Sequence, residues 1–394
     1  MISTIQEPQK NIPHVKSSFA LLCLGFRPFF LFGSIYGIIV LSYFILLISG
    51  SVETLPSALD AISWHRHEML FGYVGAVIAG FLFTAVPNWT GHTTPKGLNL
   101  ALVVLLWFVG RVVMFLSAYL PAMLVGTIDV SFFLVCAASI FPALVKSNNR
   151  RNYFFIILLV LLAFANGMTH WRNSDTGITL GRNIIILIMV LIGGRVIPFF
   201  TERPLGFNIV CNPKLERFAL ISTITALTFE VLGMNGLPMG CLYLLAMITN
   251  GWRISQWHSL KTFCEPMLWV LHAGYLWLVV GFAMKASHYF GLAVPSTIAI
   301  HASTAGGISV LTIGMMARVS LGHSGRPLKA NKPIVLSFIC INIAAFLRVF
   351  GVWLFPEFTL RWLEASSLFW LSAFSLFVVV YVPILIRPRA DGLG

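Results

Sequence analysis

The chain is a nearly unbroken series of apolar stretches, each about 20 residues long, joined by short polar connections. A helix of about 20 apolar residues crosses the hydrocarbon layer of a bilayer, so each stretch predicts one membrane-spanning helix. No connection is long enough to hold a separate domain. The pattern therefore predicts an all-α fold, a polytopic membrane helix bundle of about twelve transmembrane helices. The predicted spans are 27–49, 67–88, 98–119, 122–145, 152–171, 181–200, 216–235, 237–257, 266–286, 294–317, 333–354 and 362–386.

The polar ends of the chain set the predicted domain boundaries. We expect one twelve-span transmembrane domain at 19–387, an N-terminal tail at 1–18 and a C-terminal tail at 388–394. The first 18 residues lack the apolar core and cleavage site of a signal peptide. An even number of spans places both tails on the same side of the membrane.

The distribution of basic residues predicts which side that is. With the N-terminus in the cytoplasm, 18 of the 26 Lys and Arg residues fall on the cytoplasmic side and only five on the outer side. Cytoplasmic loops collect Lys and Arg, so both termini are predicted to be cytoplasmic in a bacterial inner membrane. The net charge of +13 follows from this topology, and we expect no binding to nucleic acid.

Composition agrees with a membrane protein. Of the 394 residues, 58% are hydrophobic and 10% are charged, against roughly 25% charged residues in soluble domains. The six cysteines include no Cys-x-x-Cys-His motif, so any haem would be held non-covalently.

Four histidines lie at or within the predicted outer ends of spans: His65, His67, His170 and His301. An ionisable side chain inside a bilayer is costly unless it is paired, hydrated or metal-bound. Because imidazole is the commonest metal ligand of proteins, we predict that these four residues bind metal.

The spacing of the first two histidines leaves two arrangements open. Successive residues of a helix advance by about 100°, so His65 and His67 would point about 200° apart. They address one centre only if the helix begins after His65, and otherwise they contact different partners. Small residues follow His67 and His301 along their spans. Such residues admit either a neighbouring helix or a flat macrocycle.

Further polar residues within the spans complete the predicted site. We expect a haem to be bound by side chains from His67, His301, His272, Arg348, Arg111 and Arg195. Two carboxylates, Glu68 and Glu230, are candidate catalytic proton donors. Arg348 needs a counter-charge, and Glu230 lies at a matching predicted depth, so an ion pair between them is also predicted.

Five separated motifs resemble those of the NnrS family. They are Gly25-Phe-Arg-Pro-Phe-Phe-Leu31, Trp64-His-Arg-His-Glu-Met-Leu-Phe-Gly72, Gly80-Phe-Leu-Phe-Thr-Ala-Val-Pro-Asn-Trp-Thr90, Gly193-Gly-Arg-Val-Ile-Pro-Phe-Phe-Thr201 and Gly314-Met-Met-Ala-Arg-Val-Ser-Leu-Gly-His-Ser-Gly-Arg326. The resemblance implies a twelve-span bacterial inner-membrane protein that binds haem b and copper and is associated with resistance to nitric oxide. The chemistry it implies is binding of nitric oxide at a histidine-ligated site near the periplasmic face, and its reduction there.

Three functions are compatible with these predictions. The first is a haem-dependent nitric oxide reductase that takes electrons from a quinol or another membrane donor. The second is a secondary transporter, because twelve spans with buried charges suit one equally well. The third is a haem-based sensor or scavenger that binds nitric oxide without turnover. The sequence leaves the oligomeric state open.

Overall fold

The computed structural model describes residues 20–172, 174–206, 209 and 211–391, and all regular secondary structure within them is helical. The predicted N-terminal tail lies outside the described residues. Ten helical segments are long and apolar enough to cross a membrane, and α8 and α9 add two more helices of 19 and 20 residues. These twelve correspond to the twelve predicted spans, so the predicted polytopic bundle is confirmed. The bounds of the spans are α1 (Phe26–Ile48), α2 (Ala61–His67) continued by η2 (Glu68–Val74) and α3 (Gly75–Thr90), α4 (Gly97–Phe115), α5 (Ala122–Lys146), α6 (Phe154–Trp171), α7 (Ser174–Leu205), α8 (Pro213–Val231), α9 (Gly236–Ser255), α10 (Pro266–Tyr289), α11 (Ser296–His301) continued by η6 (Ala302–Ile308) and α12 (Ser309–Gly322), α13 (Lys332–Phe346) continued by η7 (Leu347–Gly351) and α14 (Val352–Leu354), and α15 (Thr359–Ile386).

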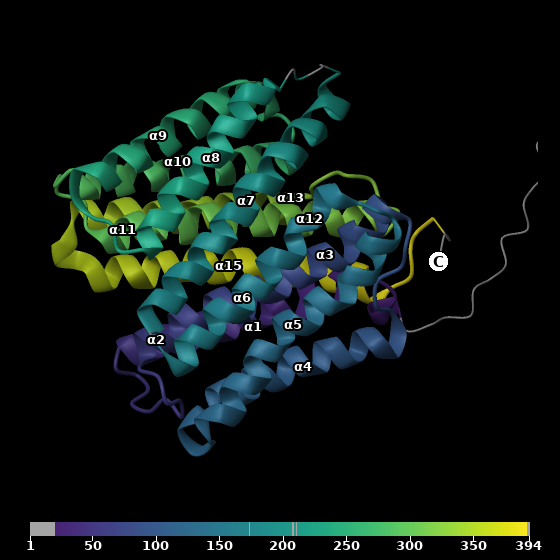
Figure 1. Ribbon diagram of the computed structural model, residues 1–394, viewed down its shortest axis with the longest axis horizontal. Helices are drawn as coiled ribbons and strands as arrows, with labels where there is room; N and C mark the ends of the chain where they lie inside the picture. The colour runs from purple at the N-terminus through teal and green to yellow at the C-terminus, as the bar shows by residue number, and fades with distance from the viewer. Residues whose placement is uncertain (1–19, 173, 207–208, 210, 392–394) are drawn as a thin grey trace, which may run out of the picture.

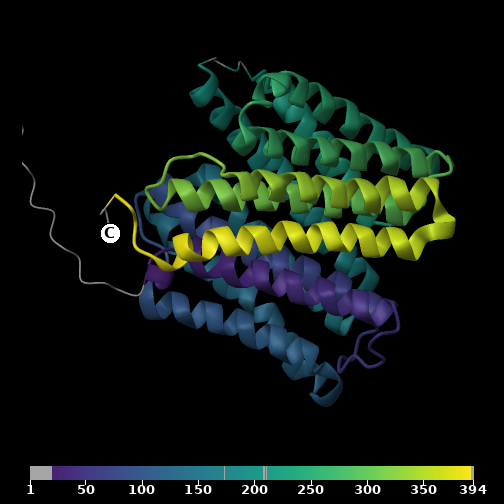
Figure 2. The same cartoon turned by 180° about the vertical axis from the view of Figure 1, so that it is seen from behind.

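The helices run roughly along one direction, and the first and last spans lie side by side (Figures 1 and 2). The Arg27 guanidinium, at the start of α1, donates hydrogen bonds to the carbonyl oxygens of Leu385 (2.8 Å) and Arg387 (2.5 Å) at the end of α15. We call this the near end of the bundle, and the opposite end, where α2 begins, the far end. The near end is the one predicted to face the cytoplasm.

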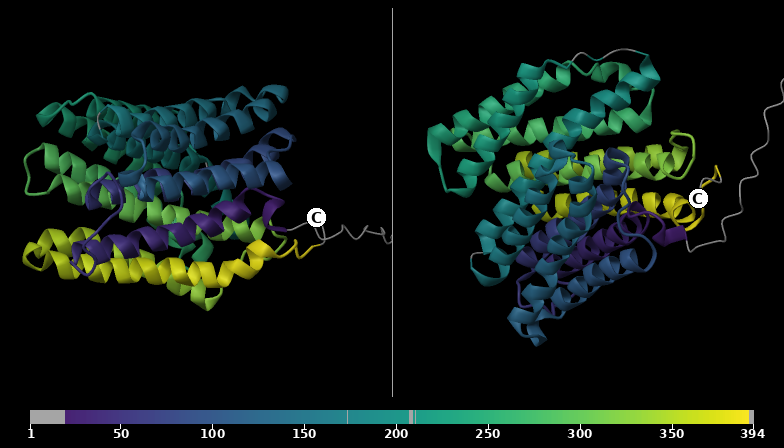
Figure 3. Two further views of the ribbon diagram at one scale, coloured as in Figure 1. Left: turned by 90° about the horizontal axis from the view of Figure 1, so that it is seen from below. Right: turned by 45° about the vertical axis from the view of Figure 1, so that its right-hand side comes forward.

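Two groups of helices lie on opposite sides of the bundle. α8, α9 and α10 pack together on one side, whereas α4, α5 and α6 pack in order on the other side, where α5 also contacts α3 (Figures 1 and 3). α7 contacts both α6 and α10 and thereby links the two groups. α10 also packs closely against η6 and α12, and α13 packs against α15.

Helix starts are specified by local side chains. Asp60 accepts hydrogen bonds from the backbone N–H groups of Ile62 and Ser63, each at 3.0 Å, and so caps α2. Asn331 caps α13 in the same way. Such caps satisfy the N–H groups that the first helical turn leaves without a partner.

Within the described residues, three spans contain a π-helical segment, and each segment lies beside or contains a residue that the sequence singled out. η2 begins directly after His67, η6 begins directly after His301, and η7 contains Arg348. A π-helical turn inside an α-helix is uncommon and is frequent at functional sites. It rotates the following residues relative to an unbroken α-helix, which changes the side chains that face the polar residue.

The small residues beside the histidines pack against protein side chains. A Cβ atom on Gly75 would lie 2.9 Å from the Phe133 ring, and one on Gly306 would lie 2.7 Å from the Trp277 ring. The space where a side chain on Gly307 would lie is filled by Leu278. Of the two alternatives that the sequence left open, close packing of neighbouring protein groups is the one observed at these glycines.

Candidate metal centre

The far half of the bundle contains a buried polar cluster centred on His67. Its members come from α2, η2, α4, α5 and α6, and every helix contributes one or two residues. The His67 side chain is 1% exposed and that of Asp129 is fully buried, whereas His170, near the end of α6, is 11% exposed. Residues distant in sequence are therefore brought together where water and lipid are both excluded. The cluster consists of His67, Glu68, Arg111, Asp129, Asn166 and His170, with Tyr36 of α1 at its edge.

One ring nitrogen of His67, Nδ1, bonds to Glu68, and the other, Nε2, faces two oxygen atoms. His67 Nδ1 lies 2.8 Å from Glu68 Oε1 and donates to it. His67 Nε2 lies 2.9 Å from Asn166 Oδ1 and 3.2 Å from Asp129 Oδ2. Asn166 Nδ2 donates to Asp129 Oδ2 at 2.9 Å, which fixes the amide with its oxygen toward His67.

A neutral imidazole has one N–H, and the bond to Glu68 uses it. The lone pair of His67 Nε2 then faces two oxygen acceptors, and buried acceptors that face one another are unfavourable without a donor or cation between them. Either a second proton on His67 or a metal ion resolves this arrangement. His170 Nε2, 3.1 Å from Asp129 Oδ2, adds another ligand atom at the same place.

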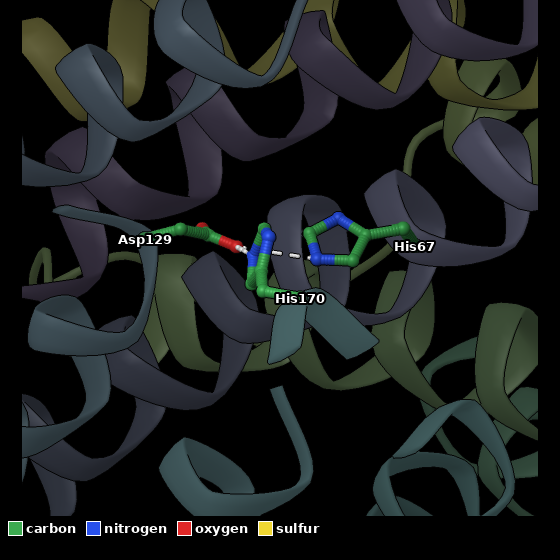
Figure 4. A group of neighbouring side chains, drawn as sticks. All are labelled: His67, Asp129 and His170. Carbon is green, nitrogen blue, oxygen red and sulfur yellow. Dashed lines mark hydrogen bonds and ion pairs between the residues drawn. The ribbon is translucent and has the colours of Figure 1, made fainter. Parts of the chain in front are cut away.

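The separations of the Asp129 carboxylate from the two imidazole nitrogens suit a single metal ion. Ligand atoms of His67, Asp129 and His170 all lie within 4.8 Å of one another. Bonds of about 2.0–2.2 Å at tetrahedral or octahedral angles place neighbouring ligands about 2.8–3.6 Å apart. The carboxylate lies 3.1 and 3.2 Å from the two imidazole nitrogens, within that range. Figure 4 shows the two rings and the carboxylate of Asp129 directed toward one another.

The residues around the three ligands orient them. The Arg111 guanidinium donates to Glu68 Oε2 at 2.7 Å and also pairs with Asp129 Oδ1. Tyr36 donates to Glu68 Oε2. A carboxylate that accepts from the far nitrogen of a histidine fixes the tautomer and the ring orientation, an arrangement typical of metal-binding histidines. With neutral histidines, the two carboxylates and Arg111 leave one negative charge in excess, which a bound cation would compensate.

His65 and His301 belong to a second cluster. Both His65 and His67 lie within α2, and the His65 ring stacks on Phe44 at 4.0 Å between centroids. The two histidines therefore contact different partners, as one of the two sequence alternatives required. His301 Nδ1 donates to the carbonyl oxygen of Thr297 at 2.7 Å, and its Nε2 accepts from Arg348 Nη2 at 3.1 Å. The four predicted metal ligands thus lie in two groups rather than one.

In the second cluster, one histidine nitrogen has no hydrogen-bond partner and the arginine has no carboxylate partner among the described residues. Within the described part of the chain, Arg348 forms no ion pair with a carboxylate. His65 Nδ1 is buried and has no hydrogen-bond partner. Arg348 also lies near enough to interact electrostatically with both histidines.

Glu230 forms a third, separate cluster, and its predicted ion pair with Arg348 is wrong. Glu230 accepts from Arg182 Nη2 at 2.8 Å and from Lys285 Nζ at 2.6 Å, with further bonds from Asn183 and Tyr243. Arg182 and Lys285 lie inside α7 and α10, with side chains at most 7% exposed. They supply the counter-charge that was expected from Arg348.

Two residues that were predicted to bind haem, His272 and Arg195, lie in the near half of the bundle. His272 has both ring nitrogens bonded, to Thr201 Oγ1 at 3.0 Å and to Ser259 Oγ at 2.8 Å. Arg195 donates to Asn152 Oδ1 at 3.1 Å and borders a cavity there. The structure does not bring either of them to His67 or His301.

The family model described as NnrS protein matches residues 20–389, nearly the whole chain. The chain belongs to the NnrS family. No curated protein matches it. Membership of the NnrS family supports a membrane protein associated with nitric oxide resistance.

In this NnrS-family chain, the sequence prediction missed three residues of the polar cluster. Asp129 lies within the predicted span 122–145 but was not assigned to the site. Asn166 lies four residues before His170, so both side chains share one face of α6, and this spacing could have revealed it. Tyr36 gave no signal, because an aromatic residue in an apolar span is indistinguishable from lipid-facing bulk.

Proposed function

We propose that the protein binds nitric oxide at a metal centre in the far half of the bundle, with copper held by His67, Asp129 and His170. The observation that carries the proposal is that the lone pair of a neutral His67 Nε2 faces two oxygen acceptors, Asn166 Oδ1 and Asp129 Oδ2, with no donor between them. A proton on His67 Nε2 would serve these two oxygens, whereas a metal ion would also engage His170 Nε2.

The charge of the cluster supports copper in its cuprous state. Glu68 and Asp129 outweigh Arg111 by one negative charge when both histidines are neutral. A monovalent ion would neutralise the buried cluster, whereas a divalent ion would leave one positive charge in a medium that penalises it. Imidazole suits copper as a ligand. When bound, cuprous copper supplies a site at which nitric oxide coordinates.

Haem b is proposed at the second cluster, beside His301 and Arg348. The bond from His301 Nδ1 to Thr297 leaves Nε2 as the ring atom that could bind iron, in place of the hydrogen bond that Nε2 accepts from Arg348. Arg348, which has no carboxylate partner in the described residues, suits a haem propionate. Arg111 is excluded from this role because Glu68 and Asp129 already occupy its guanidinium. Ferrous haem would supply a second group that binds nitric oxide.

Glu68 is proposed to position His67 and to hold a proton at the centre. Its carboxylate accepts from the Tyr36 hydroxyl, from His67 Nδ1 and from Arg111. A carboxylate that accepts hydrogen bonds from both a hydroxyl and an imidazole N–H can take up a proton from either donor. Glu230 contacts none of the metal-centre residues, and its ion pairs with Arg182 and Lys285 favour a structural role.

Spectroscopy on purified protein tests the proposal. Anaerobic protein loaded with copper and haem should change its absorption spectrum when nitric oxide is added, and His170→Ala should lose the copper-dependent part of that change. Release of nitrous oxide with a quinol donor would establish reduction, whereas binding without release would favour a sensor or scavenger. A folded, colourless protein without bound metal would contradict the proposal and favour a secondary transporter.

A further inference from the structure

A cavity at the near end of the bundle lies apart from all three far-end clusters. Its volume is about 240 Å³, and it is bordered by the end of α3, the start of α6 and the middle of α7. Trp89 and Phe155 form one wall, with their rings stacked at 5.3 Å between centroids. A second cavity of about 270 Å³ adjoins it and shares Phe81 and Trp89. Together the two cavities form a recess lined by aromatic side chains at the near end of the bundle.

The polar side of the first cavity is cationic. Arg151 and Arg195 both border it, and Arg195 is held by Asn152 Oδ1 at 3.1 Å and by the Phe154 ring at 5.2 Å. Neither arginine forms an ion pair with a carboxylate anywhere in the described ranges. The charges that Arg195 does experience, from Arg151 and Arg253, are repulsive. Arg195 is half-buried and Arg151 is exposed, and a bound anion would relieve the repulsion between the two guanidinium groups.

The level of the cavity indicates where such an anion would come from. Arg151 and Asn152 belong to η4 (Arg150–Asn152), the short connection between α5 and α6 at the near end. Trp89 is the penultimate residue of α3, and tryptophan is typical of the membrane–water interface. The cavity therefore lies at the depth of lipid head groups, and its apolar wall of Phe81, Leu191 and Ile192 continues toward the hydrocarbon layer.

We propose that this cavity binds the phosphate of an anionic phospholipid from the leaflet at the near end. The phosphate would accept hydrogen bonds from Arg195 and Arg151, and the glycerol and upper acyl chains would contact the aromatic wall. A basic recess between transmembrane helices is the feature by which membrane proteins recognise anionic head groups. Because no carboxylate borders the cavity, nothing there would pair with the cationic part of a zwitterionic lipid.

A lipid titration in detergent tests this site. Purified full-length protein is titrated with phosphatidylglycerol, and the midpoint of thermal unfolding and the lipid retained in native mass spectra are followed. We expect Arg195→Gln to raise the half-saturating lipid concentration by about fivefold or more, the effect of removing one basic contact. Arg195→Lys should retain much of the effect, because it keeps the charge.

Matched controls separate this site from general charge attraction. Arg217→Gln removes an equal charge from an exposed position near the same end of the bundle and should leave the titration unchanged. Arg151→Gln, on the η4 connection, provides a second variant should Arg195→Gln fold poorly. Phosphatidylcholine and inorganic phosphate should give no stabilisation.

Three results would overturn the proposal. Equal titrations for the Arg195 and Arg217 variants would show that the cavity is not the site. Equal stabilisation by phosphatidylcholine would show that the charge is not recognised. Stabilisation by inorganic phosphate at the same concentration would identify a free anion rather than a lipid as the ligand.

Discussion

Removal of His170 distinguishes a metal centre from a purely structural hydrogen-bond cluster. His170 is the least buried of the three proposed ligands, and its one hydrogen bond is to Asp129 at 3.1 Å. His170→Ala leaves the Arg111 pairs with Glu68 and Asp129 in place. We therefore expect the metal-free variant to lose only about 1 kcal/mol of unfolding free energy, the usual net value of one hydrogen bond.

The effect of the same variant on metal binding should be larger. Loss of a residue that merely orients a ligand lowers metal affinity by about 10- to 100-fold, so loss of a ligand should lower it by at least that much. This factor corresponds to about 1.4–2.7 kcal/mol. Because bound metal stabilises the folded state, wild-type protein should also unfold at a higher temperature with copper than without it, and the variant should show less of this increase.

The assay is competition for cuprous copper with a chromophoric chelator under anaerobic, reducing conditions. His288→Ala is the matched control, because His288 lies at the far end of α10 and bonds only to the carbonyl oxygen of Val294 at 2.9 Å. Equal copper affinity in the His170 and His288 variants would refute the metal centre. It would leave a protonated His67 as the explanation for the convergent acceptors.

Three further predictions concern residues that orient the centre. Gly72→Ala should lower the free energy of unfolding by about 1–3 kcal/mol and weaken copper binding, because the added methyl would lie 2.8 Å from Tyr36 and 3.0 Å from Arg111. Chemical unfolding measures the first effect and chelator competition the second. Glu68→Gln should lower copper affinity by about 10- to 100-fold in the same competition, and an unchanged affinity would contradict its role in orienting His67. Asp60→Ala should lower the free energy of unfolding by about 1 kcal/mol at pH 7, because the Asp60 side chain caps α2. Unfolding experiments at several pH values check this. Hydrogen bonds from Ser63 and Ile62 lower the pKa of Asp60, so the difference from wild type should shrink as the pH falls below about 4.

The number and order of spans could be predicted because hydrocarbon thickness fixes helix length. Periodicity and hydropathy identify each span separately, and no knowledge of neighbouring helices is needed. α8 and α9 were also found, although their composition is less apolar than that of the other spans. Fold class is therefore the part of this protein most directly encoded in local sequence.

The grouping of polar residues could be predicted only to the level of depth. Distance along a span gives the depth of a side chain, and His67 and His170 lie in the same half of the bundle, as predicted. Which residues meet depends on helix rotation and on which helices are neighbours. The π-helical segments after His67 and His301 also change that rotation locally. For this reason Glu230 was paired with Arg348 at matching depth, whereas its partners are Arg182 and Lys285.

The most direct test of the central claim is an anomalous difference map from crystals of copper-loaded protein, recorded at the copper absorption edge. We predict one peak between His67, Asp129 and His170, within about 2.0–2.2 Å of His67 Nε2, His170 Nε2 and Asp129 Oδ2. A map with copper bound at other residues, and no peak between these three, would contradict it.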